Sequence, residues 1–404
     1  MPKSEFADAP SIQRSTTRLP VYHEDLFAPD ALRNPYGHYA AIRNLGPVVM
    51  LGDTGIYAVS RFDDVQRALR NPDVLISGRG VGFNEIINAQ VPEPTVIHSD
   101  GARHRTLRNN LARPLMPSAL KQHREALKGM ITVQVREAIG IGWFDAIERL
   151  ARYLPVAAIS YLVGLPEDGR HNMLRWATAQ FDMQGPMSPA LEQAVAVFRE
   201  SRSYLQSFDP SQLREGSWAE ALFTAVAEGR LTEGEARAAV SGYMLPSLDT
   251  TINSKGSLLY NLARNPDQLA LLKADPTLIA SAVLENVRLS AVVRWFSRYA
   301  AEDYVQDGVS IPKGSRVMLM YASANRDERH YPDPDRYDVT RNPQDQLGWG
   351  TGSHMCIGMH LAKLEMEVLL EALVENVEGI DVGEPVMGSN NGLYGFESLP
   401  LKLS

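Results

Sequence analysis

The chain contains one cysteine, Cys356, in a glycine-rich stretch that reads LGWGTGSHMCIGMHLAKLEME. Glycines permit tight turns and let the backbone approach a flat ligand closely. The pattern predicts an amphipathic helix directly after the cysteine. The positive end of such a helix, with its unpaired N–H groups, stabilises a thiolate relative to a thiol. The stretch therefore predicts an ionised sulfur that can bind a metal.

Four roles for this cysteine can be compared. A lone buried cysteine is most often an inert small hydrophobe, but a glycine-rich loop is a poor core segment. A catalytic nucleophile needs a positioned base, and His354, two residues away along a loop, is the only close candidate. A zinc site needs three or four ligands, and His354 with Cys356 supplies two. Haem needs only one thiolate, because the porphyrin provides four other ligands, and haem is therefore predicted.

The string WGTGSHMCIG resembles the haem-binding signature of the cytochrome P-450 superfamily, Phe-x-x-Gly-x-x-x-Cys-x-Gly. The resemblance implies that Cys356 is the axial ligand of heme b (iron protoporphyrin IX). It also implies that Gly358 completes the cofactor loop and that His354 contacts a haem propionate. The chain departs from the signature at Trp349, where the family has Phe.

A long central helix is predicted from a capping box, Thr232 with Glu235, to about Ala263, where Asn-Pro stops it. Its length is roughly 45 Å at 1.5 Å per residue. Pro246 in its middle predicts a kink, because proline removes a hydrogen bond. The polar stretch 247–251 that follows indicates a functional site, or a tolerated kink whose hydroxyls bond to carbonyls one turn back.

Within this stretch, Asp249 and Thr250 stand where the resembled family has its acid–alcohol pair. The resemblance implies that the hydroxyl holds dioxygen and water while the carboxylate relays the protons that O–O cleavage needs. The usual Ala-Gly before the pair is Pro246-Ser247 here. We expect this change to narrow the oxygen cleft and to affect the coupling of electrons to product.

Other motifs of the same family occur in the expected order. Glu285 and Arg288 are spaced i, i+3 among apolar residues, which favours burial, and a buried ion pair needs further partners. The resemblance implies a structural triad with an arginine of the irregular stretch 325–342, predicted here to be Arg336. It also implies that three more side chains hold the haem propionates, namely His104, Arg108 and Arg298.

The net charge of −8 disfavours wholesale binding to nucleic acid. Seven basic residues nevertheless lie between Arg103 and Lys128, opposed only by Glu125. They indicate an acidic partner, an anionic ligand or a solvated helix face. The resemblance implies that this face lies nearest the thiolate and binds an acidic iron–sulfur ferredoxin, which a ferredoxin reductase reduces.

The resemblance also suggests a substrate pocket that is mostly apolar, which suits a small, flat, hydrophobic molecule. Its predicted members are Arg79, Phe83, Phe181, Gln184, Leu245, Val292, Val293, Phe296 and Phe396. SGRGVGF and the tail GFESLPLKLS look most like bacterial members that oxidise or demethylate para-substituted benzoic acids. Arg79 then anchors a carboxylate, or the substrate is a less polar methoxy- or alkyl-aromatic. A terpene hydroxylase, a peroxygenase and a non-catalytic haem sensor remain alternatives.

Apolar periodicity predicts helices over 63–70, 116–138, 156–163, 190–205, 277–289 and 359–374, and short strands over 48–51, 56–59 and 315–320. The predicted fold is mainly α with a smaller β portion, a cytochrome P-450 fold in one large domain, 1–404. The segment 1–34 is expected to pack on its surface. No secretory signal is visible, and the longest apolar stretch is too short to cross a bilayer, so we predict a cytoplasmic monomer with no membrane contact.

Overall fold

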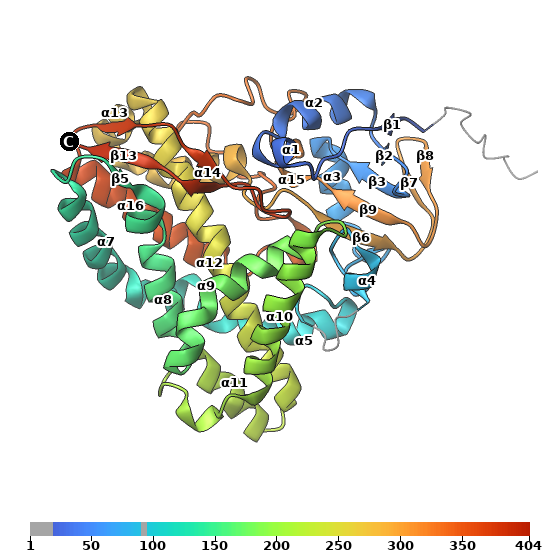
Figure 1. Ribbon diagram of the computed structural model, residues 1–404, viewed down its shortest axis with the longest axis horizontal. Coiled ribbons are helices and arrows are strands. Elements are labelled where there is room, and N and C mark those ends of the chain that lie inside the picture. The colour runs from blue at the N-terminus through green and yellow to red at the C-terminus, as the bar shows by residue number, and fades with distance from the viewer. Residues whose placement is uncertain (1–18, 90–94) are drawn as a thin grey trace, which may run out of the picture.

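The longest helix, α12 (Glu233–Arg264), runs through the middle of the molecule (Figure 1). The computed structural model describes residues 19–89 and 95–404. The predicted capping box is confirmed: the Thr232 side chain accepts from the N–H of Glu235, and the Glu235 carboxylate accepts from the N–H of Thr232. The helix ends before Asn265, as predicted, and Pro246 lies inside it without ending it.

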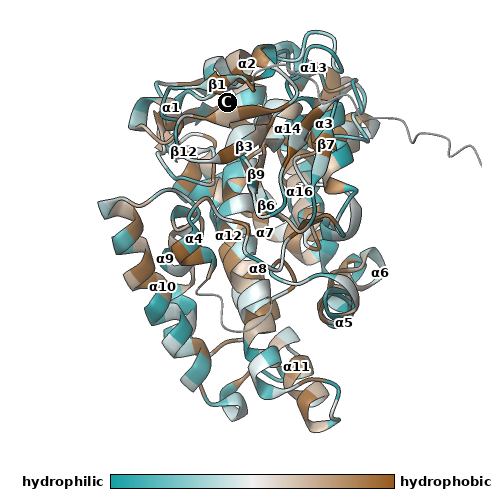
Figure 2. Ribbon diagram, turned by 90° about the vertical axis from the view of Figure 1, so that its right-hand side faces the viewer, coloured by the Kyte–Doolittle hydropathy of each residue, from teal (hydrophilic) through white to brown (hydrophobic). Residues whose placement is uncertain are grey.

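Helices packed in contact with α12 cover it on several sides. They are α8 (Tyr153–Val163), α9 (Glu167–Asp182), α10 (Pro189–Ser207), α11 (Trp218–Ala227), α13 (Pro266–Ala274), α14 (Ile279–Ser290) and α16 (Met359–Asn376), with a π-helical turn at Ile147–Ala151. Hydrophilic and hydrophobic bands alternate along α10, as expected for a helix with one buried face (Figure 2).

The other helices are shorter or more peripheral. They are α1 (Pro29–Arg33), α2 (Tyr36–Leu45), α3 (Phe62–Leu69), α4 (Glu85–Asn88), α5 (Gly101–Ala112), α6 (Pro117–Leu120), α7 (Arg124–Ala138) and α15 (Tyr321–Ala324). Among the described residues, no helix has both the length and the apolar character of a membrane span.

A six-stranded mixed sheet lies beside the helical part (Figure 1). Its order is β1 (Val21–Tyr22), β2 (Val49–Leu51), β3 (Ile56–Val59), β9 (Arg316–Leu319), β6 (Phe296–Ala300) and β4 (Leu75–Ile76). β3 and β9 are parallel, and β6 is antiparallel to β9, with Arg298 opposite Val317. Side chains alternate between the two faces of a strand, so Phe296 and Arg298 share one face of β6 while Tyr299 lies on the other.

Three small antiparallel sheets complete the strands. They are β10 (Ile380–Val382) with β13 (Pro400–Leu403) and β5 (Phe144–Asp145), β11 (Val386–Met387) with β12 (Phe396–Ser398), and β7 (Tyr304–Gln306) with β8 (Val309–Ile311).

The buried guanidinium of Arg294 joins three distant parts of the chain. It donates hydrogen bonds to the carbonyl oxygens of Leu32 in α1 and of Leu393 before β12, the latter at 2.8 Å. It also lies over the ring of Tyr394, 5.4 Å from the ring centroid. The segment before β6, helix α1 and the hairpin that includes β12 therefore meet at one side chain.

The predicted helices and strands are found, with small shifts at their ends, and the mainly α architecture is confirmed. The helix predicted over 116–138 is broken into α6, a 3₁₀ turn at Lys121–His123 and α7. The helical segment starts at Pro117 and not at Met116, because a residue before proline favours the extended conformation that Met116 adopts. The segment 1–34 is described only from residue 19, where β1 pairs with β2 and α1 buries Ala31 and Leu32.

Candidate active site

Cys356 lies between a 3₁₀ turn at Gly352–His354 and the first turn of α16. Its N–H donates to the carbonyl of Trp349 at 2.8 Å, which closes the loop. Gly352 has a φ of +75°, and a Cβ there would lie 2.7 Å from the carbonyl oxygen of Leu69. Only glycine fits this position, so the loop is fixed closely against the end of α3.

The Cys356 side chain is accessible to solvent, although protein atoms surround it closely enough that burial is the largest influence on its pKa. Burial raises the pKa of the thiol, while N–H groups of Gly358 and Met359 and the guanidinium of Arg108 lower it. Arg108 is held beside the loop by a 2.7 Å hydrogen bond to the carbonyl of Met355. A side chain that is surrounded by protein and still accessible can bind a ligand, and a metal cation bound there would complete the stabilisation of a thiolate.

Two of the predicted propionate ligands lie together beside this loop. The rings of His104 and His354 are 4.2 Å apart between centroids. Burial lowers the pKa of His104 to about 4, and His354 and Arg108 lower it further. Burial likewise lowers the pKa of His98 to about 4, with further lowering by Arg298 and His354. The four predicted ligands therefore lie close enough together for charge on one of them to affect the pKa of His104 or of His98.

Negative charge is scarce around these basic side chains. Asp100 accepts from the N–H groups of Ser77 and Gly78, and its Oδ1 lies 3.6 Å from Nε2 of His354. Within 19–89 and 95–404, neither Arg108 nor Arg298 has a carboxylate within 4 Å, and Nε2 of the buried His104 has no hydrogen-bond partner. The two carboxylates of a haem would supply the missing charge and acceptors, so the residues present fit this cofactor.

The carboxylate of Asp249 is buried, with 8% exposure, and faces α9. It accepts a 2.6 Å hydrogen bond from the hydroxyl of Thr178, which is itself exposed at the surface. Burial raises the pKa of Asp249 to about 6. The Thr178 hydrogen bond and Arg152 act to lower it, and Asp182 acts to raise it. The acid therefore titrates close to neutral pH and has a polar contact to the outside of α9.

The hydroxyls of the polar stretch bond to carbonyls one turn back, which was one of the two alternatives for this helix. Thr250 donates to the carbonyl of Pro246 at 2.5 Å, and Ser247 donates to that of Tyr243 at 2.6 Å. Each hydroxyl oxygen keeps lone pairs that can accept a further hydrogen bond. This bonding leaves Thr250 able to accept from water or a substrate.

The predicted triad forms, but with a different arginine. Arg288 contacts both carboxylate oxygens of Glu285, at 2.7 and 2.8 Å, and both side chains are fully buried. The side chain that joins them is Arg341, whose Nε lies 3.2 Å from Glu285. The prediction of Arg336 was wrong: its side chain is exposed, and only its carbonyl accepts from Arg288. A turn closed by Arg336 N–H on Asp333 directs this arginine outward, and the chain returns to the pair at Arg341.

Five apolar side chains form one compact cluster, which we call the distal cluster. Phe181, Val292 and Leu393 are buried together, with Val293 and Phe296 packed against them. They come from α9, the segment that leads from α14 into the first residue of β6, and the hairpin of β12. An isolated bridge between Val293 and Leu393 holds the last two segments together. Four of these five residues were predicted pocket members.

The structure places the other predicted pocket members elsewhere. Leu245 is fully buried in the main core. Phe396 belongs to that core too and packs on Tyr260, 5.1 Å between centroids, because β12 turns it toward the second half of α12. Phe83 packs on Phe27 at 4.8 Å, and its N–H donates to the carbonyl of Gln184.

Arg79 is exposed, and its guanidinium lies over the ring of Tyr299, 5.2 Å from the centroid. Because Tyr299 and Phe296 lie on opposite faces of β6, this position is away from the distal cluster. The expected anchor for a carboxylate is therefore absent from the cluster in this conformation.

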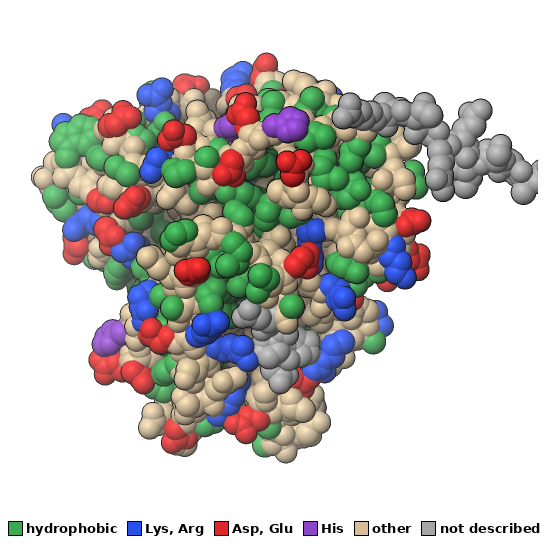
Figure 3. Space-filling view, turned by 45° about the vertical axis from the view of Figure 1, so that its right-hand side comes forward, with side chains coloured by type: hydrophobic (Ala, Val, Ile, Leu, Met, Phe, Trp, Pro, Cys, Tyr) green, Lys and Arg blue, Asp and Glu red, His purple; other side chains and the backbone are tan. Residues whose placement is uncertain are grey.

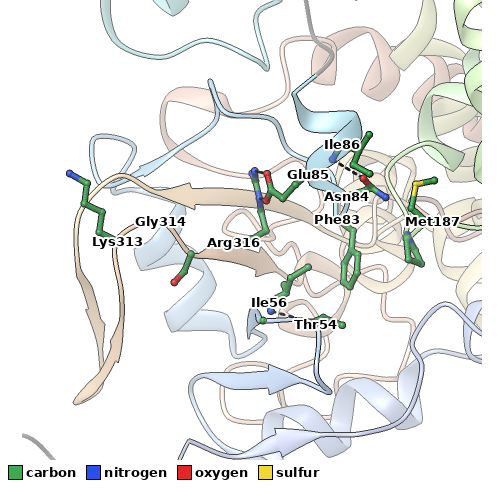
Figure 4. A pocket seen from close by; sticks show the side chains of 13 residues that line it. Thr54, Ile56, Phe83, Asn84, Glu85, Ile86, Met187, Lys313, Gly314 and Arg316 are labelled. Atoms are coloured by element: carbon green, nitrogen blue, oxygen red, sulfur yellow. Dashed lines mark hydrogen bonds and ion pairs between the residues drawn. The ribbon is translucent and has the colours of Figure 1, made fainter.

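A surface groove of about 610 Å³ opens near Phe83 (Figure 4). Its other lining residues come from the β2–β3 turn, α4, the loop before α10 and the β8–β9 turn. The Glu85–Arg316 ion pair lies at its wall, and the exposed side chains of Ile86 and Met187 lie at its rim. Across the face in Figure 3, acidic and basic side chains are interspersed.

Sequence reasoning missed Thr178 and Arg341. Nothing local marks Thr178, because only the packing of α9 against α12 brings it to Asp249. Arg341 could have been considered, since the irregular stretch contains it as well as Arg336, but its direction depends on a turn that the pattern does not predict.

Together, the fold and this site define a haem-thiolate protein. Residues 194–382 match the family model described as Cytochrome P450. The chain is 33% identical to cytochrome P450 CYP199A2 of Rhodopseudomonas palustris, over 98% of this chain and 99% of that protein. The chain belongs to the cytochrome P450 family, and it is a haem-dependent monooxygenase.

Other relatives agree with this assignment. The chain is 31% identical to a β-dihydromenaquinone-9 ω-hydroxylase of Mycobacterium bovis, over 91% of this chain and 75% of the relative. The solved structure of cytochrome P450 CYP109Q5 from Chondromyces apiculatus superposes with a TM-score of 0.80 at 26% identity, covering 95% of this chain and 98% of that one.

Proposed function

We propose that this monooxygenase inserts one oxygen atom from dioxygen into a small aromatic molecule, by hydroxylation or O-demethylation of a para-substituted ring. The observation that supports this most directly is the distal cluster, in which Phe181 and Phe296 lie with three aliphatic side chains. Aromatic and aliphatic surfaces of this size suit a compact, flat ligand. The sequence resemblance to members that oxidise para-substituted benzoic acids supports the same substrate class.

The position of Arg79 favours the less polar of the two substrate types. Its guanidinium lies over Tyr299, and all five members of the distal cluster are apolar. Burying a carboxylate without a partner is costly. We therefore favour a methoxy- or alkyl-aromatic without a carboxylate group.

The haem, when bound, supplies the electron transfer and the activation of dioxygen. Cys356 would hold its iron, with the N–H groups of Gly358 and Met359 stabilising the sulfur. The propionates would be held by the basic side chains beside the loop, namely His104, Arg108, Arg298 and His354. This arrangement would hold the cofactor against the cysteine loop.

Asp249 would carry protons from the outside of α9 to the interior. At pH 7 its carboxyl group is mostly ionised, because its pKa is about 6, so it can accept a proton and release it again. Thr178 would hold the carboxylate toward solvent, and Thr250, with its free lone pairs, would position water on the inner side.

A ferredoxin, reduced by its reductase, would dock on the face that carries the seven basic residues between Arg103 and Lys128 and deliver electrons there. Four of the seven basic residues already have defined contacts: Arg103 with Glu235, Arg124 and Lys128 with acids of α16, and Arg108 with the cysteine loop. The remaining three, which we call the basic patch, are exposed and have no ion pair among the described residues; they are Arg105, Arg113 and Lys121. Such a patch would attract an acidic partner.

The proposal is tested by a spectral-shift screen of the ferric holoprotein with matched ligand pairs. Para-methoxytoluene and para-methoxybenzoate differ in one carboxylate, and para-alkyl analogues extend the comparison. We expect the uncharged member of each pair to shift the Soret band at lower concentration. A response only to terpenes, steroids or fatty acids would overturn the proposed substrate class.

A further inference from the structure

A lysine and a glutamate meet inside the protein without hydrogen bonds. Lys255 of α12 and Glu365 of α16 have side-chain exposures of 0% and 1%, and Nζ lies 3.9 Å from Oε2. Within the described part of the chain, neither of these two atoms has a hydrogen-bond partner. The pair is therefore an ionisable site in the core that the proposed mechanism does not use.

The Glu285–Arg288 pair shows how a structural ion pair is built in the same core. There, two short hydrogen bonds join the partners, and surrounding carbonyls and Arg341 satisfy the remaining groups. A buried ion pair is stable when its hydrogen-bonding groups are satisfied in this way. Lys255 and Glu365 lack such partners, so little stabilises their charged forms and burial favours the neutral form of each.

Among the described residues, no other charged group compensates the pair. Burial is the largest influence on each pKa and the partner is the only other one: the pKa of Lys255 is lowered to about 8, and that of Glu365 is raised to about 7. On α14, Asn286 is uncharged and donates to the carbonyl of Ser254 and to the sulfur of Met366, the neighbours in sequence of Lys255 and Glu365. The net charge of the pair therefore changes near neutral pH.

The two helices that carry the pair also carry the two sides of the active site. Lys255 follows Thr250 by five residues, about 7.5 Å along α12, and Glu365 is six residues into the helix that follows Cys356, about 9 Å along its axis. α12 packs against α16. Charges at such separations interact appreciably across a protein interior, where screening is weak.

We propose that Lys255 and Glu365 form a buried proton-binding site whose occupancy is coupled to the oxidation state of the haem iron. This inference rests on the proposed haem site. When the centre gains one electron from its redox partner, the added negative charge favours protonation of the pair. The Glu365 carboxylate then takes one proton from bulk water to become a carboxylic acid, and Lys255 stays an ammonium. On reoxidation the O–H bond breaks and the proton returns to water.

The test is the reduction potential of the holoprotein, measured by spectroelectrochemistry between pH 6 and 9. We compare the wild type with Glu365→Gln and with the double variant Lys255→Met, Glu365→Leu. The control is Lys128→Met with Glu375→Gln, an exposed ion pair at 2.8 Å that involves the same helix α16. Above about pH 7, the wild-type and control potentials should fall as pH rises, while those of the two test variants should stay flat.

A wild-type slope that persists in Glu365→Gln, or a flat wild-type potential, overturns the inference. If the double variant does not fold, proton uptake on reduction is counted with an indicator dye in weakly buffered wild type and Glu365→Gln. Proton uptake at pH 7.5 that is present in the wild type and lost in Glu365→Gln supports the proposed site. Equal proton uptake in both proteins overturns it. A missing haem-thiolate band in the reduced, CO-treated wild type would instead refute the proposed function itself.

Discussion

The hydroxyl of Thr178 donates a 2.6 Å hydrogen bond to the carboxylate of Asp249, so an exposed side chain of α9 contacts a buried acid of α12. A hydroxyl that donates to a carboxylate favours its ionised form. The contact therefore opposes the effect of burial, which raises the pKa of Asp249 to about 6.

Replacing Thr178 with Val should raise the pKa of Asp249 further, because the hydrogen bond to the ionised form is lost. The fall of kcat at low pH reflects protonation of the Asp249 carboxylate, so in Thr178→Val this fall should occur at higher pH. Thr178→Ser keeps a hydroxyl and should show the wild-type pH dependence. Steady-state NADH consumption between pH 5 and 8 measures both. An unchanged fall of kcat at low pH in Thr178→Val would show that the contact does not tune the relay.

Cys356→Ala should abolish the haem-thiolate Soret band of the reduced, CO-treated protein, because no other cysteine can replace the ligand. Ser353→Ala changes an exposed residue of the same loop and should keep the band. Absorption spectra of both variants decide the matter. An unchanged band in Cys356→Ala would contradict ligation by this sulfur.

Arg341→Gln should destabilise the protein by about 1.5–3 kcal/mol, because Glu285 loses a charged hydrogen-bond partner in the core. Arg336→Gln, a change of an exposed side chain five residues earlier in the chain, should stay within about 0.5 kcal/mol of the wild type. Urea unfolding of the two variants under one set of conditions makes the comparison. Equal destabilisation would mean that the two arginines contribute alike.

The double variant Lys255→Met, Glu365→Leu should be more stable than the wild type by about 1–4 kcal/mol near pH 7.5, as found when buried ion pairs become apolar. The raised pKa of Glu365 means that its contribution to stability is lost as pH rises through about 7. The lowered pKa of Lys255 means that its contribution is lost as pH falls through about 8. The gain should therefore be largest between these values, and unfolding curves at pH 5, 7.5 and 10 test it.

Neutralising the basic patch should weaken electron delivery. Arg113→Gln with Lys121→Gln should raise the KM for ferredoxin several-fold at low salt, and the difference should shrink as ionic strength rises. Arg170→Gln with Lys402→Gln, two changes outside the patch, is the control. A ferredoxin KM that responds equally to both double variants would locate docking elsewhere.

The sequence predicted most of the fold because long helices carry strong periodic signals. The capping box at Thr232 and the stop before Pro266 gave both ends of α12, and the cysteine loop was evident from its glycines. The 3₁₀ turn at Lys121–His123 was missed because no proline or glycine marks it in the sequence.

Site residues could be predicted where they belong to a sequence motif. They could not be predicted where only tertiary packing brings them to the site. Phe181, Val292, Val293 and Phe296 do gather, but Phe396, at the start of β12, packs on Tyr260 in the main core. Thr178, Arg341 and the Lys255–Glu365 pair depend on how α9, the irregular stretch and α16 pack against other segments. Such contacts leave no periodic pattern in the chain.

The bond from Arg294 to the carbonyl of Leu32 has a practical consequence for shortening the protein. A version that starts after Leu32 would remove one hydrogen-bond acceptor of the buried Arg294 guanidinium, which lies 262 residues further along the chain. The damage would appear beside Leu393 and the distal cluster, far along the chain from the cut. Trimming at the amino end would therefore register as altered ligand affinity.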